Sequence, residues 1–214
     1  ADAVGPALAG AVELAWAAFG GAAVLYVVIS FTEYAYHRYV QHLDLNRVGP
    51  YQLARQALGA PTLVADFHVH HHRETLDDMS IDPLPQEAFP TATVHRGTAA
   101  TWLSFAKMAC VVMLQAYFPL SILGWSLPAA AAAALLATLL HLRAYNSLHP
   151  QLHGLPDVAL AQGPPSFAQW PFRESAYARW LREYHVLHHR TRATRNFNVC
   201  CPLVDHLLGT HAEA

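Results

Sequence analysis

The sequence predicts an all-α membrane protein, a helical bundle of about three to four spans with a helical, histidine-rich metal-binding cap. Its 214 residues are 54% hydrophobic and only 13% charged, whereas about a quarter of an ordinary soluble domain is charged. Three apolar stretches are long enough to cross a bilayer, which takes roughly 20 residues. The 15 histidines are spread from His37 to His211, which excludes a purification tag.

The apolar stretches define the expected spans. They run approximately over residues 7–31, 99–119 and 128–148. Gly124 interrupts the short connection 120–127, where Trp125 is expected at the membrane interface. The alternative is a soluble protein with buried helices, which the alanine run 129–134 would also suit.

The basic residues are distributed unevenly along the chain. Eleven of the 13 Lys and Arg residues lie between the first two spans or after the third. The positive-inside rule then places segments 32–98 and 149–214 in the cytoplasm, as the cap of one domain covering residues 1–214. Lys107, inside the second span, is expected to face the protein interior or a wet cavity, either in a structural role, which is favoured, or along the substrate path. Arg143 is expected to reach the interface. The net charge of -2 gives no indication of nucleic-acid binding.

Ten histidines form four groups with short, regular spacing. The first is H-x4-H, formed by His37 and His42, and the second is H-x2-H-H, formed by His68, His71 and His72. The third is H-x3-H, formed by His149 and His153, and the fourth is again H-x2-H-H, formed by His185, His188 and His189. Residues three and four apart share a helix face, so each H-x2-H-H can aim three imidazoles at one point. His37 and His42 are five apart and need a bulge, a helix end or two different metals. Pro150 disfavours helical geometry at His149.

The expected topology brings all four groups to one membrane face, because the second and third spans cross the bilayer out and back. Histidine is the commonest metal ligand, so this convergence predicts a shared metal site. The remaining histidines are expected not to be ligands: His70, His95, His141, His206 and His211. Cys110, Cys200 and Cys201 lack the spacing of a zinc finger and are interpreted as small apolar residues.

Ten imidazoles would suit two metal ions with about five ligands each. Imidazole binds zinc, copper, iron and nickel, but a binuclear zinc hydrolase would usually include a carboxylate, and none of the four groups has one. Two redox-active metals in an all-nitrogen site beside a membrane fit activation of O2 and attack on an unactivated C–H bond. Nearby polar residues are expected either to hold the second ring nitrogen of a ligand or to be solvated. These candidates are Glu33, Asp66, Glu183, Asn196 and Asp205.

Four segments resemble the motifs of the fatty acid hydroxylase/sterol desaturase superfamily, most closely its fatty acid 2-hydroxylase branch. They are EYAYHRYVQH (33–42), FHVHHH (67–72) with Asp77 and Asp82-Pro83, YNSLHPQLHG (145–154), and YHVLHH (184–189) followed by NFNVCCPLVDHLLGT (196–210). The resemblance implies a membrane-embedded helical fold in which the ten histidines bind two irons. It also implies O2-dependent hydroxylation of a fatty acyl chain, a lipid or another apolar substrate from the bilayer. Tyr145 and Asn146 are implied to shape the site.

The chain departs from this branch in three ways that leave the substrate open. Asn146 stands where aspartate is common, the pair Cys200-Cys201 replaces small polar residues, and no fused cytochrome b5 domain is present. Electrons are therefore expected from a separate ferredoxin, cytochrome b5 or reductase. The excess of Arg over Lys favours a bacterial inner membrane over the endoplasmic reticulum of a eukaryote.

Three other functions remain open at this point. A desaturase would use the same di-metal site, and a membrane zinc-dependent hydrolase would hold zinc, which is also a possible occupant of a purified iron protein. A haem or metal-transport protein is the third, although transport would need ligands deep within the spans, where only His141 comes near.

Overall fold

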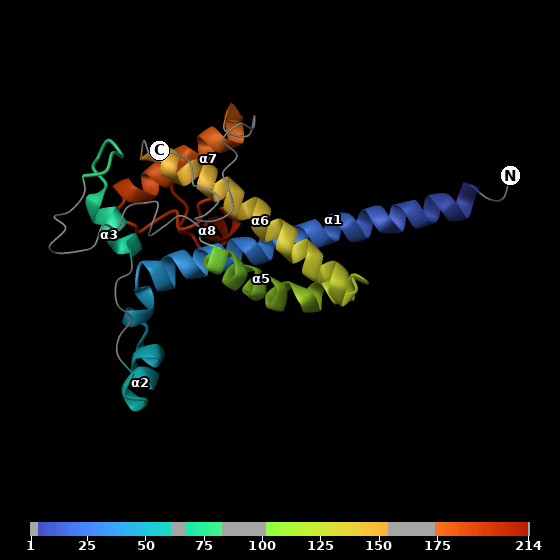
Figure 1. Cartoon of the computed structure of the whole chain (residues 1–214), viewed down its shortest axis with the longest axis horizontal. Helices are drawn as coiled ribbons and strands as arrows, with labels where there is room; N and C mark the ends of the chain where they lie inside the picture. Colours follow the sequence, from blue (N-terminus) through green and yellow to red (C-terminus); the bar gives the residue numbers. More distant parts are fainter. Residues whose placement is uncertain (1–3, 61–66, 83–101, 154–173, 214) are drawn as a thin grey trace.

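The computed structural model describes residues 4–60, 67–82, 102–153 and 174–213 (Figure 1). Every regular element in these ranges is a helix, and one isolated antiparallel bridge joins Thr75 to Ile81. The helices are α1 (Val4–Ala35), η1 (Tyr36–Gln41), η2 (Asp44–Arg47), α2 (Gly49–Ala57), α3 (Phe67–Glu74), α5 (Trp102–Ile122), α6 (Leu127–Leu152), α7 (Ala176–Arg190) and α8 (Leu203–Leu207). The all-α prediction is confirmed for the described part of the chain.

Three helical segments are long and apolar enough to cross a membrane, as the sequence predicted. They are Ala15–Gln41, Phe105–Ile122 and Leu127–Leu152. The first and third helices continue beyond their predicted ends, to Ala35 and Leu152. Polar side chains in these last turns have partners inside the protein, so each helix continues beyond the end of its apolar stretch. Residues 99–101, the predicted start of the second span, lie outside the described residues.

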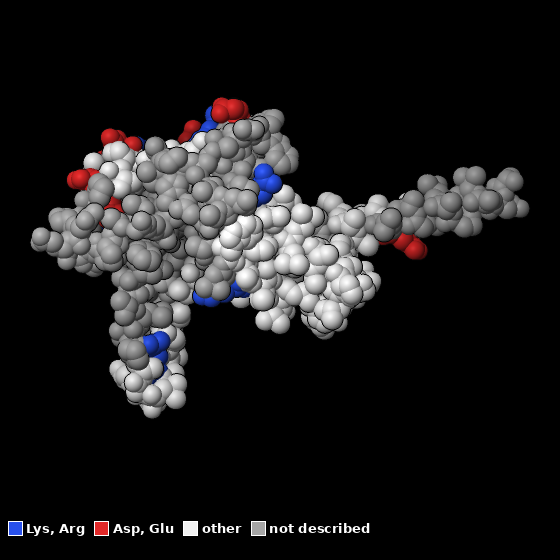
Figure 2. All heavy atoms as spheres, in the orientation of Figure 1, with Lys and Arg blue, Asp and Glu red and all other residues white. Residues whose placement is uncertain are grey.

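The long helices expose large apolar side chains. Trp16 and Phe19 of α1 and Leu114, Phe118 and Ile122 of α5 are 69–78% exposed. Soluble proteins rarely expose contiguous apolar surface on this scale, so the soluble alternative is disfavoured and an integral membrane protein is indicated. Figure 2 agrees, because charged side chains gather around the end that holds α3 and α7, away from the tip of the α5–α6 hairpin.

Small residues allow the long helices to approach closely. Ala116 of α5 and Ala130 and Ala134 of α6 are fully buried, in one cluster with Leu25 and Ile29 of α1. Residues four apart lie on one face of a helix, and small side chains on such a face bring membrane helices into contact. The alanine run is therefore a packing surface between helices.

One face of α1 connects this packing to the polar end of the molecule. The buried residues Gly21, Leu25, Ile29, Glu33 and His37 follow one another at intervals of four. The face begins at the tip of the hairpin, passes through the apolar cluster and ends at a histidine. The position of the hairpin along α1 thus sets the position of the polar end.

The tip of the hairpin docks against a glycine of α1. Gly124 has φ +83 and reverses the chain, as expected of a residue that interrupts the connection. Trp125, which the sequence placed at the membrane interface, packs on α1 and donates from Nε1 to the carbonyl of Ala17 at 3.3 Å. A Cβ atom built on Gly21 would lie 2.5 Å from the Trp125 ring, so this contact depends on glycine.

Lys107 does not face the protein interior, because its side chain is exposed. It lies in the second turn of α5, near the start of the second candidate span. The alternative of a wet cavity stays a prediction. Arg143, expected to reach the interface, is half-buried.

We expect Gly21→Ala to lower the free energy of unfolding by about 1–3 kcal/mol, because the added methyl group overlaps the Trp125 ring. Thermal unfolding in detergent, followed by near-UV circular dichroism, measures the change. Gly20→Ala is the matched control, since its Cβ meets only the flexible Leu123 side chain at 3.2 Å. Equal stability of the two variants would contradict this packing.

Candidate metal centre

Nine of the ten predicted side chains gather in two buried, adjacent groups at one end of the bundle. The first group comprises His37, His42, His68, His72 and His188, and the second comprises His71, His149, His153 and His189. In each group one ring nitrogen per residue lies within 4.8 Å of all the others. The groups draw on η1, α3, α7 and the last turn of α6, which are far apart in the chain.

A π-helix resolves the five-residue spacing of the first box. In η1 the amide of His42 donates to the carbonyl of His37 at 3.0 Å, a bond between residues five apart. A π-turn at the end of α1 therefore places both side chains on one face. Their Nε2 atoms are 3.1 Å apart and belong to one group. Of the three possibilities left open, the structure selects a bulge at a helix end.

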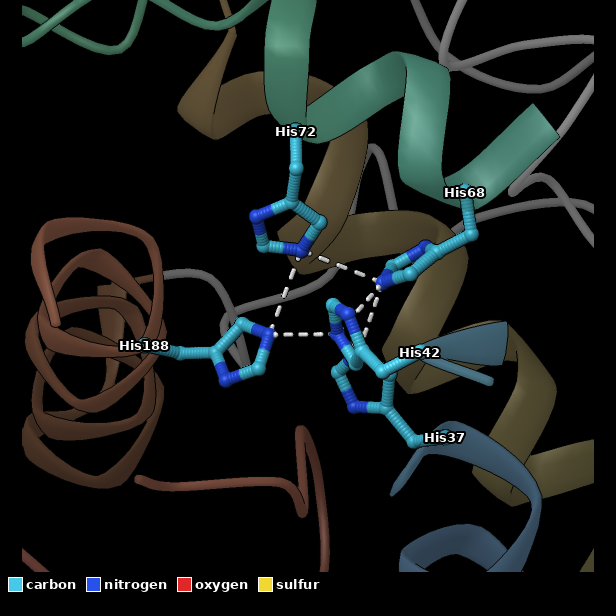
Figure 3. Close-up of side chains that lie close together, drawn as sticks. All are labelled: His37, His42, His68, His72 and His188. Atoms are coloured by element: carbon cyan, nitrogen blue, oxygen red, sulfur yellow. Dashed lines mark hydrogen bonds between the residues drawn. The ribbon is translucent and has the colours of Figure 1, made fainter. Parts of the chain in front are cut away.

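The Nε2 atoms of the first group converge from three parts of the chain: α3, α7 and the end of α1 (Figure 3). Six pairs among them lie 2.7–3.2 Å apart. Two ligands at right angles around an ion with bonds of about 2.1 Å would be about 3.0 Å apart, against about 3.4 Å at a tetrahedral angle. The five nitrogens are thus close enough together to hold one metal ion.

Backbone carbonyls fix the orientation of three rings. Nδ1 of each ring lies against a carbonyl oxygen, with pairs His37–Phe197, His188–Arg195 at 2.7 Å and His153–Met79 at 2.7 Å. A carbonyl oxygen only accepts, so Nδ1 carries the proton and Nε2 presents its lone pair to the site. Metal-binding histidines usually have such a partner. Sequence reasoning had no signal for these acceptors, because every residue has a carbonyl group.

The second group is less compact, but it has the same chemistry. Nε2 of His71 and of His153 are buried and meet no hydrogen-bond partner in the described part of the chain. A buried polar atom of this kind calls for an unseen partner, and a metal ion between these rings would provide one. The His72 and His189 rings stack with centroids 4.1 Å apart, so the two groups are in direct contact.

Each H-x2-H-H helix serves both groups. In α3, His68 and His72 belong to the first group and His71 to the second. In α7, His188 and His189 are divided in the same way. Neither H-x2-H-H box aims all three of its imidazoles at one of these two groups. Side chains three and four positions apart diverge on either side of a helix face, which lets one helix reach two neighbouring ions.

His185 belongs to neither group. It is completely buried, with Nε2 3.2 Å from Nε2 of His189 and its ring centroid 4.7 Å from that of His149. It lies beside the second group, so its predicted role as a ligand stays a prediction. Pro150 does not end the helix before His149, because α6 continues to Leu152.

Burial keeps the site histidines uncharged. Burial and the neighbouring His188 lower the pKa of His42 to about 3. Burial lowers the pKa of His153 to about 4 and that of His188 to about 4. Burial, followed by neighbouring imidazoles, also lowers the pKa of His68, His71, His72, His185 and His189. The rings are therefore neutral at pH 7, the form that binds metal.

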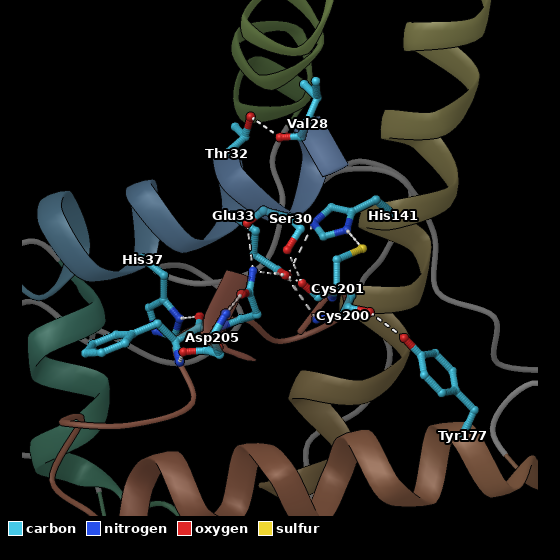
Figure 4. Close-up of polar contacts among 12 residues, drawn as sticks. Val28, Ser30, Thr32, Glu33, His37, His141, Tyr177, Cys200, Cys201 and Asp205 are labelled. Atoms are coloured by element: carbon cyan, nitrogen blue, oxygen red, sulfur yellow. Dashed lines mark hydrogen bonds and ion pairs between the residues drawn. The ribbon is translucent and has the colours of Figure 1, made fainter. Parts of the chain in front are cut away.

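A buried carboxylate on α1 holds the loop that runs from α7 to α8 (Figure 4). Glu33 accepts hydrogen bonds from the amides of Cys200 and Cys201, both at 3.0 Å, and from the side chain of Asn198 at 3.1 Å. Ser30, one turn earlier, donates to the carbonyl of Cys201. The loop is thereby fixed to the helix that carries His37.

A second carboxylate holds the same loop from its other side. Asp205 accepts from the amide of Phe197 at 3.0 Å, the amide of Asn198 at 2.6 Å and the hydroxyl of Thr210 at 2.6 Å. These bonds position the Phe197 carbonyl that orients His37. Glu33 and Asp205 thus influence the site through the backbone, not by binding a ring nitrogen of the two groups.

The other polar candidates have different surroundings. Glu183 is exposed, and Asp66 lies outside the described residues. Asn196 is buried and donates to the carbonyls of Tyr184 and Ala212. Tyr145 stacks on the His149 ring with centroids 5.0 Å apart, and the neighbouring Asn146 is fully buried.

A third group was missed by the sequence analysis. His141 Nε2 lies 3.5 Å from a Glu33 oxygen, and its Nδ1 lies 3.9 Å from Sγ of Cys201. Such a group could hold a metal ion, but three N–H donors already occupy the carboxylate. We interpret this third group as part of the contacts by which Glu33 holds the loop between α7 and α8. The sequence offered no signal for this group, because its three residues are far apart in the chain.

The other histidines and the cysteines lie in varied surroundings. His141 lies outside both histidine groups, as do His206 and His211, whose rings stack at 3.8 Å. Nothing is described of the side chains of His70 and His95. Among the cysteines, Cys200 packs in an apolar cluster as expected, Cys201 also approaches His141, and Cys110 is exposed.

No family model, curated protein or solved structure matches the chain. The class is therefore defined by fold and site: a helical protein with three candidate membrane spans and two adjacent histidine groups that could hold metal ions.

We expect Glu33→Gln to lower the free energy of unfolding by about 1–3 kcal/mol, because a buried N–H donor loses its acceptor. The displaced loop should also weaken metal binding by about tenfold or more. Thermal unfolding and metal titration of the purified protein measure both effects. Glu183→Gln, an exposed change two residues from His185, is the control and should alter neither.

The metal-free protein should lose stability in acid. An unfolded histidine titrates near pH 6.5, whereas His42, His153 and His188 titrate near 3 to 4 in the folded state. Their contribution is therefore complete above pH 6.5 and declines as the pH falls toward 4, by up to about 1.4 kcal/mol per pH unit for each. Denaturant unfolding at a series of pH values tests this, and unchanged stability from pH 7 to 5 would contradict it.

Proposed function

We propose that this chain is a membrane-bound non-haem di-iron monooxygenase that hydroxylates a C–H bond of a fatty acyl chain, a lipid or another apolar substrate. One observation carries the proposal, namely two adjacent, buried groups of imidazoles at one end of an apolar helical bundle. The motifs similar to those of the fatty acid hydroxylase/sterol desaturase superfamily support the same function.

The donor set favours iron over zinc. The five converging nitrogens of the first group exceed the four ligands of a typical tetrahedral zinc site. Within the described residues, neither histidine group includes a carboxylate, which a binuclear zinc hydrolase would usually have. Two bound irons would supply the activation of O2 that oxidation of an unactivated C–H bond requires.

The chain's own residues prepare the site in three ways. The carbonyls of Phe197 and Arg195 hold the proton of His37 and His188 on Nδ1 and leave Nε2 free to bind. Burial excludes water and keeps the rings neutral. Stacking on Tyr145 holds the plane of His149.

The reaction needs a reductant and an apolar substrate. One atom of O2 enters the C–H bond and the other leaves as water, with two electrons from a separate ferredoxin, cytochrome b5 or reductase and two protons from solvent. The first candidate span contains His37 and the third contains His149, so a lipid-like substrate reaches the site from the bilayer. The basic residues gathered on the same side favour a site on the cytoplasmic face of a bacterial inner membrane.

Metal and oxygen measurements on the purified protein test this function. We expect about two irons per chain and O2 uptake that depends on both a reductant and a lipid substrate. Isotopically labelled O2 should place label in a product hydroxyl group. His72→Ala should lower iron content and uptake, whereas His206→Ala, an exposed change outside both groups, should not. An unlabelled alkene product would indicate a desaturase, and tightly held zinc with hydrolysis would overturn the proposal.

A further inference from the structure

The short helix α2 has an apolar stripe along one face. The stripe comprises Pro50, Leu53, Ala54, Ala57 and Leu58, spaced at intervals of three and four. This is the pattern of an amphipathic helix that buries one face. Its other positions are polar or amphipathic, with Gln52 nearly opposite Ala54.

The stripe is nevertheless uncovered. Leu53 is 67% and Leu58 81% exposed, and α2 has no buried residue. Among the described elements α2 packs mainly against η2, the short turn before it. An apolar face this open needs a covering surface, and the described helices other than η2 do not supply one.

The position of α2 identifies that surface. The first candidate span ends at Gln41, and α2 begins eight residues later at Gly49, close to the end of that span. Figure 1 shows α2 turned across the direction of α1, α5 and α6. A helix that crosses the direction of the spans at their end lies along the plane of the membrane surface.

Ion pairs fix this bend in the chain. Asp44 accepts from Arg38 at the end of α1 at 3.2 Å and from Arg47 at 3.4 Å. Leu43, with φ +61, reverses the direction of the backbone between them. The crosswise direction of α2 is thus held by several contacts.

The charge of α2 also suits a lipid surface. Arg55 projects beside the stripe, with its guanidinium 5.2 Å above the Tyr51 ring, and Arg47 precedes the helix. Cationic side chains bordering an apolar face are typical of helices that lie in the interface of anionic bilayers. The stripe would also continue the apolar surface formed by Phe31 and Tyr36 at the end of the first span.

We propose that α2 is an interfacial helix whose apolar stripe lies in the headgroup region of the bilayer, on the side of the membrane that holds the histidine groups. The occupant of the stripe is lipid, with anionic headgroups beside Arg47 and Arg55. The helix fixes the depth and tilt of the polar end relative to the membrane. The proposal is independent of the metal and of the reaction.

Two variants, each with one introduced cysteine, compare the faces of α2 in the full chain, in which the buried Cys200 and the partly buried Cys201 are kept and their labelling is measured in the parent. Cys110→Ala removes the exposed thiol and serves as the parent protein. Ala54→Cys lies in the centre of the stripe and Gln52→Cys on the opposite face, and both positions are exposed. Each variant is labelled with an environment-sensitive fluorophore and reconstituted in vesicles of neutral lipid or of neutral lipid mixed with phosphatidylglycerol.

We expect lipids with a quencher on the acyl chain to quench the label at position 54 severalfold more strongly than the label at position 52. Aqueous iodide should show the opposite order, and phosphatidylglycerol should increase the difference. Equal quenching of the two labels would overturn the proposal. Protection of position 54 from both quenchers, or disulfide cross-linking between copies at that position, would overturn it in favour of a protein partner.

Discussion

Convergence of imidazole nitrogens in a dry interior is the constraint on which the structure depends. Buried polar groups are costly unless they find partners, and here Nε2 atoms approach one another to 2.7–3.2 Å. Two of the five rings already place their single proton on Nδ1, toward a carbonyl. The six contacts among these rings therefore exceed the N–H donors that remain, and a cation satisfies them best.

The rest of the fold holds this convergence in place. A π-turn at the end of α1 turns His42 beside His37. The loop before α8 brings a carbonyl to His37, and two buried carboxylates fix that loop by its amides. Substitution of Glu33 would therefore displace the His37 ring, which Glu33 does not contact. The same face of α1 packs against α5 and α6 in the apolar cluster, so the packing of the helical bundle affects the position of the site.

Parts of the site were readable from residue types and spacing. The four histidine boxes were evident, and nine of their ten side chains gather as the topology predicted. Their division into two groups could not be predicted, because histidines on one helix face can bind one ion or two neighbouring ions. The role of Glu33 was open as well, since a carboxylate four residues before a histidine suits both a solvated surface and a buried clamp.

The sequence by itself determined the helical class, the three apolar spans and the histidines that meet at their end, because these follow from composition and from spacing along one helix. The tertiary structure alone decided the π-turn, the division of each H-x2-H-H and the carbonyl partners at Phe197, Arg195 and Met79. These features arise where distant segments meet, and a carbonyl group is the same in every residue. Only the folded chain shows which of them faces a ring.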